Sequence, residues 1–176
     1  MADVKKYIPF LFKYEGFKYT NDPIDMGLAT KGGVTLATWK RVGYDKNDDG
    51  KIDENDIKLL TKEDVVNKVL IPHFWNKWQA DKIKNQSIAN LLVDWLYMSG
   101  KYGIIFPQRI LGVPDDEIVG KITLDAINNA PNKAELFSKL WNRRLKHFQD
   151  IVKKNPSQKR FLRGWVRRLQ ALHFEP

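Results

Sequence analysis

The strongest constraint on the fold is the apolar segment at residues 86–100. Apolar side chains occupy most faces of a helix over this range, which is typical of a helix that other helices surround. Apolar residues also recur at helical spacing in residues 4–14, 136–151 and 161–172. The chain has 176 residues and no cysteine, so we expect one sizeable hydrophobic core without disulfides. These patterns predict a mainly α-helical fold.

Asp94 is the only acidic residue in this central segment. Burial of a carboxylate is unfavourable unless a partner compensates the charge. Asp94 is therefore expected to reach the surface, to cap a neighbouring helix or to line a cleft. A structural role is favoured, and a substrate-binding role in a cleft is the alternative.

The residues best suited to catalysis lie in residues 15–35. The apolar spacing before this stretch places Glu15 near the C-terminal end of a helix, where Gly16 is the expected stop. The turn signal Asn-Asp-Pro and several glycines follow, so the chain can reverse its direction sharply. Three further polar side chains can thereby return towards Glu15, namely Asp22, Asp25 and Thr30.

These side chains have the chemistry that glycoside hydrolysis needs. One carboxylic acid protonates the leaving oxygen, and a second polar group holds water or stabilises the cationic transition state. Glu15, Asp22, Asp25 and Thr30 are the candidates for these roles, and spacing does not choose between the two aspartates. Retention or inversion of the anomeric centre also stays open, because it depends on the distance between carboxylates.

The pattern over residues 15–35 is Glu-Gly-x-x-x-x-Asn-Asp-Pro-x-Asp-x-Gly-x-x-Thr-x-x-Gly-x-Thr. It resembles the signature of the N-acetylmuramidases of glycoside hydrolase family 108, formerly called secretion activators. The resemblance implies a lysozyme-like helical domain with a short loop or β-hairpin at the active site, and it makes Glu15 the catalytic acid. Phe17 stands where a second glycine is usual, and residues 28–31 also depart from the common pattern.

Residues 106–128 predict a helix, a loop and a second helix. This part resembles the predicted peptidoglycan domain of the same family. It is more faintly similar to wall-binding repeats, through Gln-x-x-Leu-Gly at residues 108–112 and Gly-x-x-Thr-x-x-Ala at residues 120–126, although Glu117-Ile118 stands where those repeats have Asp-Gly. A helical hairpin that completes the core without a separate binding function is the favoured interpretation, and a peptidoglycan-binding role is the alternative. Since no linker precedes this part, we expect residues 1–100 to form the N-acetylmuramidase region and residues 101–176 to pack on it as one compact unit.

A second specific motif lies at residues 45–56 and matches a calcium-binding loop. The turn glycine and the apolar residue stand at the required places, while an aspartate replaces the usual bidentate glutamate at the last position. A structural Ca²⁺ site is favoured, and a metal-free polar turn is the alternative. The expected ligands are Asp45, Asn47, Asp49, the Lys51 carbonyl and Asp56.

Two tryptophans, Trp75 and Trp78, follow a helix that Thr61 opens and that Pro72 is expected to interrupt. Their rings can stack on sugars, so Trp75 is a candidate substrate-binding residue. Aromatic residues at this spacing are more often core residues, and the core is the favoured interpretation.

Positive charge is concentrated in the C-terminal part. From Lys133 onward, twelve Lys or Arg residues and three acidic residues account for the whole net charge of +9. Such a surface suits an anionic polymer, either cell wall or nucleic acid. We expect peptidoglycan glycan strands as the partner, no nucleic acid, no membrane span and a monomer. No organic cofactor is expected, because a Gly-rich strand-to-helix turn and a Cys-His cluster are both missing from the sequence.

The N-terminal residues resemble neither a signal peptide nor a membrane span, because Pro9 and Lys13 interrupt a short apolar run. We therefore expect synthesis in the bacterial cytoplasm and action at the periplasm or cell wall after non-classical release or lysis.

Together the motifs favour a peptidoglycan hydrolase, and the resemblance implies cleavage of the β-1,4 bond between N-acetylmuramic acid and N-acetylglucosamine. Three other functions explain part of the sequence: a calcium-binding structural protein, a nucleic-acid-binding module and a non-catalytic cell-wall-binding protein. The first leaves residues 15–35 without a purpose, and the second predicts binding that survives loss of Glu15. The third is the hardest to separate, because a glutamate is necessary for hydrolysis without being sufficient.

Overall fold

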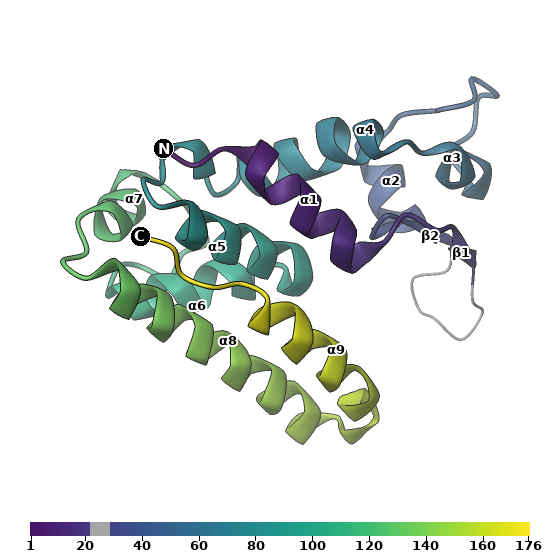
Figure 1. Cartoon of the computed structure of the whole chain (residues 1–176). Coiled ribbons are helices and arrows are strands. Elements are labelled where there is room, and N and C mark those ends of the chain that lie inside the picture. The colour runs from purple at the N-terminus through teal and green to yellow at the C-terminus, as the bar shows by residue number, and fades with distance from the viewer. Residues whose placement is uncertain (22–28) are drawn as a thin grey trace. The chain divides into compact units, whose positions relative to one another are not determined.

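The computed structural model describes residues 1–21 and 29–176 (Figure 1). The described chain is mainly α-helical with a three-stranded antiparallel sheet, which confirms the expected fold class and its short β-segment. Residues 4–74 form one compact unit, the sheet unit, and residues 1–3 with 75–176 form another, the helical unit. These units are defined by packing. The expected division at residue 100 separates regions by role and stays a prediction.

The sheet unit combines short helices with the sheet. The strand order is β1-β2-β3, and Thr30 of the central strand is paired with Thr20 on one side and Thr35 on the other. In chain order the elements are α1 (Val4–Glu15), β1 (Thr20–Asn21), β2 (Ala29–Lys31), β3 (Val34–Thr35), α2 (Leu36–Val42), α3 (Glu54–Leu59), α4 (Lys62–Asp64) and the π-helix η1 (Val65–Trp75).

Side-chain caps fix the starts of two helices of this unit, of which the sequence predicts the one at Thr61. Thr35 Oγ1 accepts a hydrogen bond from the Thr38 backbone N–H at 3.2 Å. Thr61 and Asp64 form a reciprocal capping box at the start of α4. Such caps matter most in short helices, because few internal hydrogen bonds hold them.

Helix η1 differs from the expectation. The sequence predicts a break at Pro72, whereas the π-helix runs through Pro72 to Trp75. Proline normally breaks an α-helix, because its ring clashes with the preceding turn and it lacks an N–H. The wider turn of a π-helix gives the ring more room, so the helix continues.

The core of the sheet unit forms around Trp39, whose side chain is fully buried. Phe12, Phe17 and Tyr19, which lie on either side of Glu15 in the sequence, pack on this core. The chain is therefore held in place immediately before and after Glu15. The other core residues are Ala29, Val34, Ile57, Leu60, Val65 and Val69.

The helical unit is organised around the predicted central helix α5 (Gln86–Ser99), in which nine residues are buried. Helices α6 and α8 pack on α5, and α8 and α9 form a hairpin (Figure 1). The other elements are η2 (Ala80–Lys82), α6 (Tyr102–Leu111), α7 (Lys121–Asn128), α8 (Lys133–Lys154), η3 (Pro156–Gln158) and α9 (Lys159–Gln170). Within the described ranges, every helix is too short or too polar to cross a membrane.

Gly103 allows α6 to approach α5 closely. A Cβ atom at Gly103 would lie 2.3 Å from the backbone nitrogen of Leu96 and 2.5 Å from its Cα. Backbone atoms cannot move aside as a flexible side chain can, so the contact between α5 and α6 depends on the missing side chain.

Both ends of the described chain are bound near the start of α5. The Ala2 N–H donates to the Ile83 carbonyl at 2.8 Å, and the Asp3 N–H donates to Gln86 Oε1 at 2.8 Å. Gln86 Nε2 in turn donates to the Asp3 carbonyl at 3.2 Å. Near the other end, the Glu175 N–H donates to Ser87 Oγ at 2.9 Å. We call residues 1–3 the N-terminal strap.

Candidate active site

Glu15 is the last residue of α1, as the sequence predicts. The helix stops because Gly16 adopts a left-handed conformation with φ of 67°, and the Gly16 N–H still donates to the Phe12 carbonyl at 3.0 Å. The Glu15 side chain is half-buried. A carboxyl group at this position is accessible to a ligand and is held on a regular helix.

Phe17 fixes the chain that follows Glu15. Its ring meets the Phe12 ring edge-on, with 5.8 Å between the ring centroids. The turn between β2 and β3 lies directly against it, since a Cβ atom at Gly32 would come within 2.9 Å of Phe17 Cδ2. Lys31 Nζ lies 4.9 Å from the centroid of the same ring. The phenylalanine that departs from the family pattern therefore joins α1 to the sheet.

The sheet positions Thr30 and the ends of the loop after Glu15. Thr30 is half-buried in the central strand β2. Asp22 and Asp25 lie outside the described residues. The neighbours of that segment, Asn21 and Ala29, are paired with each other across β1 and β2. The structure thus describes the two residues that flank the segment with the two aspartates.

Helix α3 holds the strands β1 and β2 in place. The Tyr19 hydroxyl donates to Glu54 Oε2 at 3.1 Å, and Asn21 Nδ2 donates to the same oxygen at 3.0 Å. Desolvation, together with the negative charge and hydrogen bond of Glu54, raises the pKa of Tyr19 above its ordinary value. Lys31 Nζ donates to the Lys58 carbonyl at 2.6 Å, so β1 and β2 are both tied to α3.

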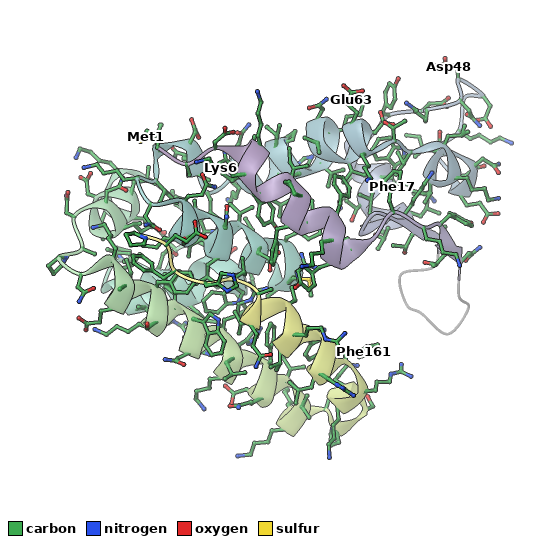
Figure 2. All side chains as sticks on the ribbon, in the orientation of Figure 1. Met1, Lys6, Phe17, Asp48, Glu63 and Phe161 are labelled. Atoms are coloured by element: carbon green, nitrogen blue, oxygen red, sulfur yellow. The ribbon has the colours of Figure 1, made fainter. Side chains whose placement is uncertain are left out.

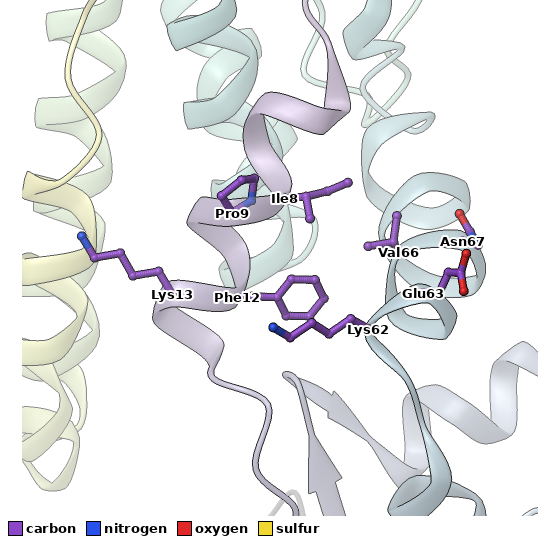
Figure 3. Close-up of a pocket in the computed structure, with 8 residues that line it drawn as sticks. All are labelled: Ile8, Pro9, Phe12, Lys13, Lys62, Glu63, Val66 and Asn67. Carbon is purple, nitrogen blue, oxygen red and sulfur yellow. The ribbon is translucent and has the colours of Figure 1, made fainter.

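An open groove of about 680 Å³ lies between α1 and the helices α4 and η1 (Figure 3). Helical spacing puts Glu15 on the same face of α1 as Ile8 and Phe12, one turn beyond the groove. The groove combines apolar contact surface with two cations. Its lining residues are Ile8, Pro9, Phe12, Lys13, Lys62, Glu63, Val66 and Asn67.

The loop at residues 45–56 closes on itself through its expected ligands. The Gly50 N–H donates to Asp45 Oδ2 at 2.7 Å, and the Asp49 N–H donates to Asn47 Oδ1 at 3.2 Å. Asp56 is fully buried and accepts hydrogen bonds from the Lys46 N–H at 2.6 Å and the Asp53 N–H at 2.7 Å. Among the residues that the structure describes, none donates a hydrogen bond to the buried Oδ1 atom of Asp45.

One of these features favours calcium binding and another disfavours it. The bare, buried oxygen of Asp45 fits a cation ligand, whereas both oxygens of Asp56 already accept backbone hydrogen bonds. Across residues 1–21 and 29–176, no group of three or more His, Cys, Asp or Glu side chains is arranged to hold a metal ion. Calcium binding by Asp45, Asn47, Asp49, the Lys51 carbonyl and Asp56 stays a prediction.

Asp94 lies in the helical unit and is fully buried. Arg144 of α8 donates to Asp94 Oδ2 at 2.7 Å, and Arg168 of α9 donates to Asp94 Oδ1 at 2.6 Å. Two cations thus compensate one buried carboxylate, which agrees with the structural role that the sequence favours. The carboxylate has no exposed surface for a sugar, and its role in substrate binding stays a prediction without geometric support.

Trp75, the last residue of η1, and Trp78 are also buried. Trp75 is 4 % exposed and Trp78 is fully buried. Their rings therefore pack as core residues, the interpretation that the sequence favours. Sugar stacking on Trp75 stays a prediction that would need the ring to become exposed.

Gln108 has a role that sequence reasoning missed. Its fully buried amide donates to Asp116 Oδ1 and to the Ile118 carbonyl, both at 3.1 Å, and it accepts a hydrogen bond from the Glu117 N–H at 3.1 Å. The glutamine of the Gln-x-x-Leu-Gly run therefore holds the loop between α6 and α7. The signal that could have revealed it is a glutamine on the apolar face of a predicted helix.

Comparisons with known proteins cover nearly the whole chain. A family model described as Glycosyl hydrolase 108 matches residues 8–100, and one described as Predicted Peptidoglycan domain matches residues 102–170. The solved structure of Brucella abortus SagA is similar, with 26% sequence identity and a TM-score of 0.78. The match covers 96% of this chain and 90% of that chain. A search of curated proteins found no match.

Proposed function

The chain belongs to the glycosyl hydrolase 108 family, and we propose that it cleaves the β-1,4 bond between N-acetylmuramic acid and N-acetylglucosamine with Glu15 as the general acid. Its fold is the mainly α, lysozyme-like fold expected from the sequence. Family membership makes it a glycoside hydrolase, and the Predicted Peptidoglycan domain supports peptidoglycan as the substrate.

The observation that carries the proposal is the position of Glu15. A half-buried carboxyl group stands at the end of α1, between two aromatic residues that anchor the chain in the core. A fixed carboxylic acid can deliver its proton to a glycosidic oxygen that the groove side of α1 presents to it. In this mechanism Asp22, Asp25 and Thr30 hold the attacking water or stabilise the cationic sugar.

The test compares release of reducing sugar from purified peptidoglycan by the wild type and by Glu15→Gln. We expect the folded variant to lose at least about two orders of magnitude in rate, the range for removal of a general acid. Glu135→Gln is the matched control, because it makes the same change at an exposed residue of α8. Circular dichroism checks that each variant is folded. Activity of Glu15→Gln close to that of the wild type would contradict the assignment.

Wall binding without catalysis is the second candidate, because the Predicted Peptidoglycan domain model matches residues 102–170 independently of Glu15. It predicts that the wild type and Glu15→Gln both bind purified peptidoglycan and that neither cleaves it. The same experiment therefore separates the two candidates.

The proposed substrate also fixes where the protein acts. Peptidoglycan lies outside the cytoplasmic membrane, so we place the action of the protein, as a monomer, at the periplasm or cell wall. Cell fractionation before and after lysis tests the location, and sedimentation of the purified protein tests the monomer.

A further inference from the structure

The structure sorts the positive charges of the C-terminal part into compensated and uncompensated groups. Arg144 and Arg168 bind the buried Asp94. Lys139 and Lys146 form ion pairs with acidic residues one turn away on α8. These four charges are neutralised within the protein and contribute little to an attraction for a ligand.

Six exposed cations remain in the last turn of α8 and along α9, near whose start Figure 2 shows Phe161. The sequence contains no acidic residue between Ile151 and Phe174. None of the six cations forms an ion pair with another residue of the described ranges. They are Lys153, Lys154, Lys159, Arg160, Arg163 and Arg167.

Three of these cations form a straight row on α9, which we call the basic row: Lys159, Arg163 and Arg167. Successive members are four residues apart, which corresponds to a rise of about 6 Å along one helix face. The row borders an open groove of about 600 Å³ together with Leu162, Val166 and Gln170. An elongated ligand with regularly repeated negative charges fits such a row.

The opposite side of α9 is fixed in the helical unit. Arg168 is bonded to Asp94 of α5, and the Trp165 ring packs on Phe148 of α8 with 5.5 Å between the ring centroids. The basic row therefore projects from a rigid support. Changes to its exposed side chains are expected to leave the fold intact.

We propose that the basic row and its groove bind peptidoglycan through the carboxylates of its peptide side chains. Guanidinium groups bind carboxylates with two parallel hydrogen bonds, and Leu162 and Val166 offer apolar contact between the charges. The match to the Predicted Peptidoglycan domain includes the whole row. This inference deepens the proposed function, on which it rests for the identity of the polymer, and assigns wall docking to residues of α9 that take no part in the proposed catalysis.

The test measures co-sedimentation of the full chain with purified peptidoglycan at low and high salt. The row variant is Lys159→Gln/Arg163→Gln/Arg167→Gln. The matched control is Lys121→Gln/Lys139→Gln/Lys146→Gln, which removes three charges that already have ion-pair partners on their own helices. We expect the row variant to bind about fivefold more weakly or worse at low salt, the difference to shrink at high salt, and the control to bind like the wild type.

A second arm of the experiment changes the peptidoglycan instead of the protein. Amidation of the peptidoglycan carboxylates should weaken binding of the wild type to the level of the row variant. The inference is overturned if both triple variants weaken equally, which would indicate a net-charge effect. It is also overturned if the row variant binds peptidoglycan normally but loses binding to double-stranded DNA or to anionic lipid vesicles.

Failure of the proposed function is distinguishable from failure of this inference. Glu15→Gln is expected to bind peptidoglycan normally, and the row variant is expected to retain cleavage of short soluble glycan fragments. A wild type that binds through the row without cleaving would contradict the proposed function alone.

Discussion

Asp94 joins three helices of the helical unit through one carboxylate. The residue comes from the middle of α5, and its partners Arg144 and Arg168 come from α8 and α9. The exposed fraction of the side chain is 0% for Asp94 and Arg144 and 6% for Arg168. Loss of the carboxylate alone would leave two buried guanidinium groups without their counter-charge. This lowers the free energy of unfolding far more than replacing all three charged side chains by apolar ones would.

We expect Asp94→Ala to lower the free energy of unfolding by about 3–5 kcal/mol, as urea denaturation would measure. Asp150→Ala is the control, because it removes an exposed carboxylate paired with Lys146 and should cost about 1 kcal/mol or less. If Asp94 instead binds substrate, the Asp94→Asn variant should have a nearly normal free energy of unfolding and a raised KM.

His147 makes stability depend on pH. Burial lowers the pKa of His147 below its ordinary value of 6.5, and the nearby Arg143 adds to this effect. In the unfolded chain His147 therefore binds a proton once the pH falls below about 6.5. In the folded state it binds this proton only at a lower pH. The free energy of unfolding should fall as pH drops through this window, by at most about 1.4 kcal/mol per pH unit.

The measurement is urea denaturation of the wild type and His147→Gln between about pH 5 and pH 8. We expect the variant to lose the part of the pH dependence that begins near pH 6.5. His73 and His173 are exposed and unchanged in the variant, so the difference isolates His147. Parallel pH curves for the two proteins would refute the assignment.

At the residue scale, the sequence shows that a charged residue lies in an apolar helix. It does not show which residues compensate that charge. Asp94 is visible as a lone acid in an apolar helix. Its partners are 50 and 74 residues away, among ten other cations of the same C-terminal part. Their identity depends on packing between helices, and a single sequence does not encode such distances in its local pattern.

At the element scale, two glycines inside helices predict opposite outcomes. Gly103→Ala places a methyl group against the backbone of Leu96, so we expect α5 and α6 to separate and the free energy of unfolding to fall by about 1–3 kcal/mol. Gly164→Ala in α9 meets no atom within 4 Å and should raise the free energy of unfolding by about 0.5–1 kcal/mol. Thermal and urea denaturation of the two variants measure both changes in the free energy of unfolding. Equal changes for Gly103→Ala and Gly164→Ala would rule out the steric explanation.

Calcium binding is a prediction about the loop that precedes α3. If one Ca²⁺ ion binds, calcium at ten times its Kd should raise the free energy of unfolding by about 1.4 kcal/mol, and a chelator should reverse this gain. Isothermal titration should show binding by the wild type and by Asp48→Asn, and weaker binding by Asp45→Asn. Asp48 is exposed and stands outside the ligand pattern, which makes it the matched control. No heat of binding at millimolar calcium would remove the site.

Elements with local signals were predictable, and elements shaped by their neighbours were not. The end of α1 at Gly16, the cap at Thr35 and the capping box at Thr61 depend on residues within one helical turn. The passage of η1 through Pro72 has no such local signature, because an unbroken helix there contradicts the intrinsic preference of proline. The attachment of Tyr19 to α3 likewise depends on Glu54, which is 35 residues away in the sequence.

At the scale of the whole molecule, the sequence predicted a helical protein organised around residues 86–100 and a catalytic segment near its beginning. It did not predict that packing groups the first three residues with the chain after residue 74. That grouping is accompanied by three hydrogen bonds of Ala2 and Asp3 to Ile83 and Gln86, residues more than 80 positions away. Local patterns define which elements form, whereas pairing over such separations decides which elements share a core.

The N-terminal strap affects the unfolding of residues 4–74. Since the strap belongs to the helical unit, residues 4–74 leave that unit and return to it, so they are a tethered loop and not a free tail. A loop whose ends are held gains less conformational entropy on unfolding than a tail does, by an amount that grows with the logarithm of its length. The three hydrogen bonds of Ala2 and Asp3 therefore help to stabilise a unit to which neither residue belongs.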